Sequence, residues 1–107
     1  MIKAVFYKKN NEFFGFSVQG HAGYADSGKD IICSAVSALT INTVNSVEKL
    51  TDDKFSTEMA ENGDLKFKVV SEISSKSILL IDSLYLGLTD IEEEYGKNFV
   101  KVYIREV

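Results

Sequence analysis

The sequence predicts an α+β domain, with a mainly antiparallel sheet in ββαββαβ order and two helices packed on it. Three observations lead to this prediction. Five short segments alternate apolar and polar residues as strands do, and two long segments place apolar residues at helical spacing. Polar, turn-forming residues separate consecutive strand segments, which indicates hairpins and therefore antiparallel pairing. The 107 residues suit one domain, which we expect to span residues 1–107.

The chain opens with a predicted hairpin. Residues 1–8 and 12–19 have the alternation of strands, and the polar run 8–11 between them is turn-like. One face of the second strand is expected to carry Phe14, Phe16 and Val18.

A glycine-punctuated loop over residues 20–29 leads into a predicted helix over residues 30–50. Either Ser27 and Asp30 form a capping box, or Asp30 is itself the cap. The expected buried stripe consists of Ile32, Val36, Leu39, Thr43, Val47 and Leu50. Cys33 therefore lies in the first turns of this helix.

The third and fourth strands are predicted over residues 54–61 and 64–71. Between them stands Asn62-Gly63, which favours a two-residue hairpin turn because both turn positions need a positive φ. A last strand is predicted over residues 98–105.

The second helix is predicted over residues 74–95, with Gly96 as its stop. It is apolar on more than one side, because three leucines lie off its main stripe. These are Leu79, Leu80 and Leu86. Such a helix is either buried within one chain or part of a homodimer interface.

Net charge and cysteine content limit the functions that the chain is expected to have. The formal net charge is −4 and the pI is near 4.9, so the chain lacks the basic footprint typical of nucleic-acid binding. No apolar run approaches the roughly 18 residues of a membrane span, and the N-terminal segment does not read as a signal peptide. We therefore expect a cytoplasmic protein without membrane association. One cysteine and one histidine build neither an internal disulfide nor a Cys/His zinc site within one chain.

His21 and Cys33 are the candidate chemical pair. A helix start and a nearby imidazole both favour the reactive thiolate, and free amides at the helix start can stabilise an oxyanion. If the loop folds back, His21 becomes the base for the Cys33 nucleophile. The alternative is structural, because a lone cysteine in a helix is usually a small buried hydrophobe.

Other residues near this pair also have two interpretations. Asp30 either caps the helix or orients His21 as a third catalytic group. Ser37 lies four residues after Cys33 and either supports the site or bonds to its own helix. Tyr24 is either a substrate contact or a packing ring. The loop glycines either admit substrate or form an ordinary connection; they are Gly20, Gly23 and Gly28.

The segment over residues 20–37 resembles the bacterial ribosomal-processing cysteine protease family, Prp. The matching residues are Gly20, His21, Ala22, Gly23, Gly28, Asp30, Ile31, Ile32, Cys33 and Ser37. Ser34 departs from the alanine that the family pattern places after the cysteine, and serine is nearly as small.

The resemblance implies an enzyme that removes the N-terminal extension of large-subunit ribosomal protein twenty-seven. Cys33 would be the nucleophile and His21 the general base and acid. It further implies a homodimer, which favours an interface on the second helix, a loop ordered around its peptide substrate, and no cofactor or metal.

A non-catalytic ribosome-assembly or adaptor module is the alternative, since the chain is small and holds one histidine and one cysteine. A redox sensor built on Cys33 fits less well, because the chain holds no second cysteine to resolve an oxidised thiol.

Overall fold

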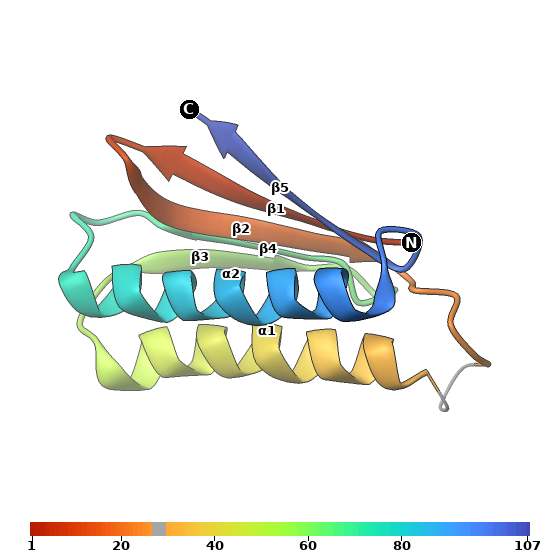
Figure 1. Cartoon of the computed structure of the whole chain (residues 1–107). Coiled ribbons are helices and arrows are strands. Elements are labelled where there is room, and N and C mark those ends of the chain that lie inside the picture. Colours follow the sequence, from red (N-terminus) through yellow and green to blue (C-terminus); the bar gives the residue numbers. More distant parts are fainter. Residues whose placement is uncertain (27–29) are drawn as a thin grey trace.

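The computed structural model describes residues 1–26 and 30–107 (Figure 1). Its elements are β1 (Ile2–Lys9), β2 (Glu12–Gly20), α1 (Ile31–Leu50), β3 (Phe55–Met59), β4 (Leu65–Val69), α2 (Ser75–Tyr95) and β5 (Val100–Glu106). They build one five-stranded sheet in the order β3-β4-β2-β1-β5, with both helices on one side. The predicted fold class and element order are confirmed. Two predicted roles, Ser27 as a capping partner and Gly28 as a substrate contact, fall outside the described residues.

The sheet is mixed, because β1 pairs in parallel with β5 while the pairs β1–β2, β2–β4 and β3–β4 are antiparallel. A parallel pair needs a long crossover, which the chain from β2 through α2 supplies. The alignment of strands stacks large apolar residues on the helix side. Phe6 stands opposite Phe16, and Phe16 opposite Phe67; all three are fully buried.

A tight turn joins β1 to β2. Asn10 and Asn11 have φ of 52° and 64°, a conformation that asparagine tolerates better than most residues. The register then shifts between Tyr7 and Lys8, so β2 carries one extra residue. As a result Phe13 is buried in the core, while Phe14 lies beside Tyr7, with ring centroids 6.4 Å apart.

The prediction that Phe14 shares a face with Phe16 is therefore wrong. A strict period of two holds only in the absence of a bulge. Here the bulge moves the core position from Phe14 to Phe13.

The β3–β4 connection is longer than the predicted two-residue turn. The Ala60 N–H donates to the Asp64 carbonyl oxygen at 2.8 Å, and the Gly63 N–H donates to the Ala60 carbonyl oxygen at 2.9 Å. Of these loop residues only Gly63 has a positive φ, at 92°. The loop over residues 60–64 is thus a turn followed by a glycine bulge, and the two flanking strands are shorter than predicted.

The core lies between the helices and one side of the sheet, where the Phe6 ring packs edge-on against Tyr85 of α2 at 5.2 Å. Leu39 is 37% exposed and Leu50 63%, so their predicted burial is wrong. Leu39 instead contacts α2 at Gly87, where an added Cβ would lie 3.0 Å from the leucine Cδ1. The buried stripe of α1 is Ile32, Val36, Thr40, Thr43 and Val47.

By length and composition alone, α1 is apolar enough to cross a membrane. Core helices of other proteins have the same property. Here the buried stripe of α1 joins the hydrophobic core, so the composition of this helix is explained by packing.

Candidate active site

The site is built where β2 ends, the loop begins and α1 starts (Figure 1). Gly20 closes β2 with φ of 92°, and a Cβ there would collide with the carbonyl oxygen of Met1. Only glycine combines that φ with so close a backbone neighbour. The chain leaves the sheet at this point, and His21 follows directly as an exposed residue.

Asp30 is the N-cap of α1, and it also fastens the loop to the helix. Its Oδ1 accepts from the backbone N–H groups of Ile32 and Cys33, both at 3.0 Å, and its Oδ2 accepts from the Tyr24 N–H at 3.1 Å. The pKa of Asp30 lies below its usual value, chiefly because the Cys33 backbone N–H binds the carboxylate. Burial opposes this shift, while the Tyr24 N–H and the Cys33 thiol reinforce it.

These bonds correct one expectation. The amides of Ile32 and Cys33 at the helix start are bound to Asp30, so the prediction that they are free to stabilise an oxyanion is wrong. The capping role of Asp30 is shown. Its orientation of His21 stays a prediction.

Cys33 is the third residue of α1 and is half-buried. Its Sγ accepts a hydrogen bond from the Ala22 N–H at 3.3 Å. Thus the backbone beside His21 folds back onto the thiol. An N–H donor and a helix N-terminus both favour negative charge on sulfur, which suits a nucleophile.

A hollow of about 80 Å³ brings His21, Cys33 and Ser37 together. Its other lining residues are Ile2, Val18, Gln19, Gly20, Val36, Asn62, Gly63 and Asp64. A thiol and an imidazole in one hollow are the elements of cysteine acyl transfer. The proposed catalytic and supporting roles of these three residues stay predictions.

The sequence did not indicate that the β3–β4 loop belongs to this site. The Asp64 Oδ1 accepts from the Gly20 N–H at 3.0 Å, and the Asp64 N–H donates to the Asn62 Oδ1 at 3.0 Å. This loop therefore holds the backbone directly before His21. Its sequence signal, Asn62-Gly63-Asp64, indicated only a turn.

The remaining predicted substrate contacts are one tyrosine and two glycines of the described loop residues. The Tyr24 ring packs edge-on against Tyr95 and Phe99, with centroids 5.8 and 5.3 Å away, and neither Tyr24 nor Gly23 lines the described hollow. Gly20 does line it. Substrate contact by Tyr24, Gly23 and Gly20 stays a prediction.

A known protein family matches nearly the whole of this chain. The model of the family described as "Cysteine protease Prp" matches residues 1–100. This chain belongs to the Prp family of cysteine proteases. It is therefore a cysteine endopeptidase, as the sequence predicted.

Two curated Prp relatives have nearly the same identity to this chain but match different shares of it. The ribosomal processing cysteine protease Prp of Bacillus subtilis is 28% identical over 104 residues, covering 92% of this chain and 93% of its own. The protein of that name from Staphylococcus aureus is 29% identical over 82 residues, covering 76% of this chain and 77% of its own.

Solved structures agree with the fold. A Streptococcus mutans structure has a TM-score of 0.82 at 34% identity, over 100% of this chain and 96% of the other. The S. aureus ribosomal processing protease Prp with a covalently linked product peptide has a TM-score of 0.92 at 23% identity, over 98% and 100%. At the latter identity the likeness concerns the fold alone.

Proposed function

We propose that this chain cleaves peptides with Cys33 as nucleophile and His21 as general base and acid. The observation that carries the proposal is the shared hollow, in which the Cys33 Sγ sits at the start of α1 and accepts the Ala22 N–H. His21 takes the thiol proton as Sγ attacks the scissile carbonyl carbon. The imidazolium then gives this proton to the leaving amine as the C–N bond breaks. Water, deprotonated by His21, then attacks the thioester carbonyl carbon. The C–S bond breaks, the peptide acid leaves, and the proton on His21 returns to the Cys33 sulfur.

The Ala22 N–H is our candidate for oxyanion stabilisation. It already points at Sγ from 3.3 Å, and the oxyanion forms on the carbon that bonds to this sulfur. A backbone donor held in place before reaction costs no reorganisation when charge develops. This assignment replaces the helix-start amides that Asp30 occupies.

As substrate we propose the precursor of large-subunit ribosomal protein twenty-seven, which would lose its N-terminal extension in the cytoplasm and so become competent for ribosome assembly. The support is twofold: the curated relatives carry the name ribosomal processing cysteine protease, and the S. aureus relative has been solved with a substrate peptide.

The test is cleavage of that precursor by purified enzyme, followed by intact mass. Wild type should release the extension at one bond, and Cys33→Ala should release none. His21→Ala should slow cleavage by about a hundredfold or more, in the range of a lost general base. Ser34→Ala is the matched control, because it changes an exposed neighbour of Cys33 to the residue expected in the family. Equal processing by wild type and Cys33→Ala would disprove the assignment.

We further propose a homodimer that pairs through α2. Leu79 is 69% exposed and Leu86 63%, and their separation of seven residues places them on one helix stripe. Two large leucines on an outward stripe are typical of a helix that meets a partner.

Sedimentation of Leu79→Glu and Leu86→Glu tests the interface. Each should shift the enzyme to monomer, whereas Leu50→Glu, which alters an equally exposed leucine at the end of α1, should leave the dimer intact. A monomeric wild type would refute the proposal, as would a dimer that survives both α2 changes.

A further inference from the structure

The two edges of the sheet differ in how their backbone is protected. β3 and β5 are the edge strands (Figure 1), and an edge strand presents N–H and C=O groups that have no partner within its sheet. At β5 the Val102 N–H, which points away from β1, donates to the Glu92 Oε2 of α2 at 2.7 Å. A charged side chain of the second helix thus occupies an outward donor of β5.

The ladder between β3 and β4 shows which backbone groups of β3 point outward. At its two ends the Val70 N–H donates to the Lys54 carbonyl oxygen and the Ala60 N–H donates to the Asp64 carbonyl oxygen, both at 2.8 Å. In an antiparallel ladder, pairs that exchange hydrogen bonds alternate with pairs that do not, so the even-numbered residues of β3 bond to β4. The odd-numbered residues therefore turn their N–H and C=O groups away from β4; they are Phe55, Thr57 and Met59.

These outward groups of β3 are open. Within residues 1–26 and 30–107, no backbone or side-chain group forms a hydrogen bond with them. β3 also lacks the features that discourage an added strand, since it contains no proline or lysine and pairs with β4 without a bulge. The edge of β3 can therefore accept another strand, whereas α2 protects the edge of β5.

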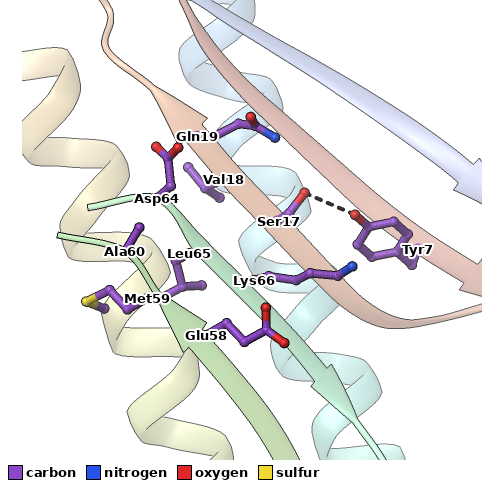
Figure 2. A pocket seen from close by; sticks show the side chains of 10 residues that line it. All are labelled: Tyr7, Ser17, Val18, Gln19, Glu58, Met59, Ala60, Asp64, Leu65 and Lys66. Carbon is purple, nitrogen blue, oxygen red and sulfur yellow. Dashed lines mark hydrogen bonds between the residues drawn. The ribbon is translucent and has the colours of Figure 1, made fainter. Parts of the chain in front are cut away.

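β3 leads directly to the candidate active site. Met59 is followed by the loop over residues 60–64, and Asn62, Gly63 and Asp64 of this loop line the Cys33 hollow. Met59 also lines a second hollow, of about 460 Å³ (Figure 2). Three residues line both hollows, namely Val18, Gln19 and Asp64. An extended chain that follows the edge of β3 past Met59 therefore arrives beside Cys33.

We propose that the peptide substrate binds as an added strand on the outer edge of β3. This inference rests on the proposed peptidase function and names how that site holds its substrate. At about 3.4 Å per residue, the stretch from Phe55 to Met59 spans about 14 Å and matches about five peptide residues on one side of the scissile bond. Continuity of the edge with the Cys33 hollow favours the substrate over a second copy of this chain as the occupant.

Strand addition has a consequence for recognition. The outward groups of β3 belong to the backbone, and main-chain hydrogen bonds supply the affinity when a peptide extends a sheet. Binding along β3 should therefore require an extended peptide with free backbone N–H groups at every second position, more than particular side chains.

Amide hydrogen exchange followed by NMR tests the pairing directly. The protein is Cys33→Ala, which holds the peptide without cleaving it, and the ligand is a peptide spanning the proposed cleavage site. At saturating peptide the amides of Phe55, Thr57 and Met59 should exchange at least about tenfold more slowly than in the free protein. The even-numbered amides of β3 already bond to β4 and are the internal control, which should change little.

Proline substitution tests the same contact by kinetics. Thr57→Pro removes an outward N–H and spares the ladder to β4, and edge strands tolerate proline at such positions. KM should rise about tenfold, the upper range for one hydrogen bond, with kcat within about twofold of wild type. Thr57→Val keeps the N–H and should behave as wild type. Ile104→Pro, which removes an outward N–H on the opposite edge, is the matched control and should leave KM unchanged.

A series of substrate peptides, each N-methylated at one backbone nitrogen, requires no altered enzyme and replaces Thr57→Pro if thermal unfolding shows that this variant does not fold. Cleavage should weaken at alternate positions on one side of the scissile bond, because only every second N–H faces β3. Losses without this alternation would overturn the proposal.

The other outcomes separate this inference from the function on which it rests. If wild type cleaves the peptide but the edge amides exchange as fast with it as without it, strand addition is wrong and the peptidase assignment stands. If these amides are protected without peptide, increasingly so at higher protein concentration, the edge pairs with a second copy and the proposal is overturned. If wild type does not cleave the peptide, the proposed function fails and strand addition of a substrate fails with it.

Discussion

Replacing Asp64 by alanine should slow peptide cleavage while leaving the fold intact. The carboxylate accepts the Gly20 N–H at 3.0 Å and the Asn62 side-chain amide at 3.3 Å. The first bond holds the residue directly before His21. Its loss should let the start of the loop leave the position in which His21 faces the Cys33 hollow.

The size of the effect follows from the bond. Hydrogen bonds to charged groups contribute about 1.5–3 kcal/mol when buried, and partial exposure at Asp64 lowers this to about 1 kcal/mol. If that energy holds the loop in its working position, kcat/KM falls about fivefold. The loss should fall on kcat rather than KM, because the imidazole and not a substrate contact is displaced.

Asp64→Asn is the matched control, since an amide oxygen can still accept from the Gly20 N–H. It should lose less than twofold. The assay is steady-state cleavage of a peptide spanning the proposed cleavage site, with thermal unfolding in parallel. Wild-type kcat/KM in Asp64→Ala would refute the reasoning, and equal losses in both variants would show that charge rather than the bond matters.

Three further predictions concern the backbone. Asp30→Asn should be less stable than wild type at neutral pH, and the difference should vanish on acidification: because the folded-state pKa of Asp30 lies below its usual value, the carboxylate stabilises wild type fully above the unfolded pKa and loses this contribution as pH falls through the folded value. Gly20→Ala should destabilise by at least about 1–3 kcal/mol in urea unfolding, from its positive φ and the clash with Met1. Gly87→Ala should stabilise by about 0.5–1 kcal/mol, because helix propensity improves and the partly exposed Leu39 can yield.

Each of these has a result that contradicts it. Equal stability of wild type and Asp30→Asn at neutral pH would mean that the carboxylate bonds do not persist in solution. A Gly20→Ala enzyme as stable as wild type would mean that the backbone there relaxes freely. A lower melting temperature in Gly87→Ala would show that Leu39 is fixed in place.

Local patterns predicted the elements well, because alternation and helical spacing are properties of contiguous residues. They failed where one extra residue shifts the alternation of side chains along a strand. The bulge that sends Phe13 inward and Phe14 outward could not be located from the sequence, because Phe13 and Phe14 are identical neighbours and either could face the core. Both asparagines of the first turn take positive φ values, whereas in the predicted turn Asn62-Gly63 only Gly63 does.

The pairing of residues far apart along the chain could not be predicted from the sequence, for a different reason. Nothing near β5 indicates that it joins β1 in parallel, and nothing near Asp64 indicates that its carboxylate meets the Gly20 amide. Both contacts join residues far apart along the chain, and each is set by how the whole sheet is ordered. His21 and Cys33 line one hollow, and their catalytic partnership stays a prediction.

Net charge illustrates the same limit. A value of −4 correctly describes the chain, yet it averages over surfaces that strand alternation separates. Lysines spaced by two, such as Lys66 and Lys68, share a face only once their segment is known to be a strand exposed on one side.

The position of β1 inside the sheet has a consequence for synthesis. β1 is bordered by β2 and by β5, and a ribosome makes β1 about a hundred residues before β5. Until the last strand leaves the exit tunnel, one edge of β1 has no partner and the sheet cannot be completed. Such long-range closure slows folding and exposes an open strand edge to aggregation. The sheet is therefore completed only once β5 has been made, whereas the pairing of Gly20 with Ile2 of β1 beside the candidate site can form before it.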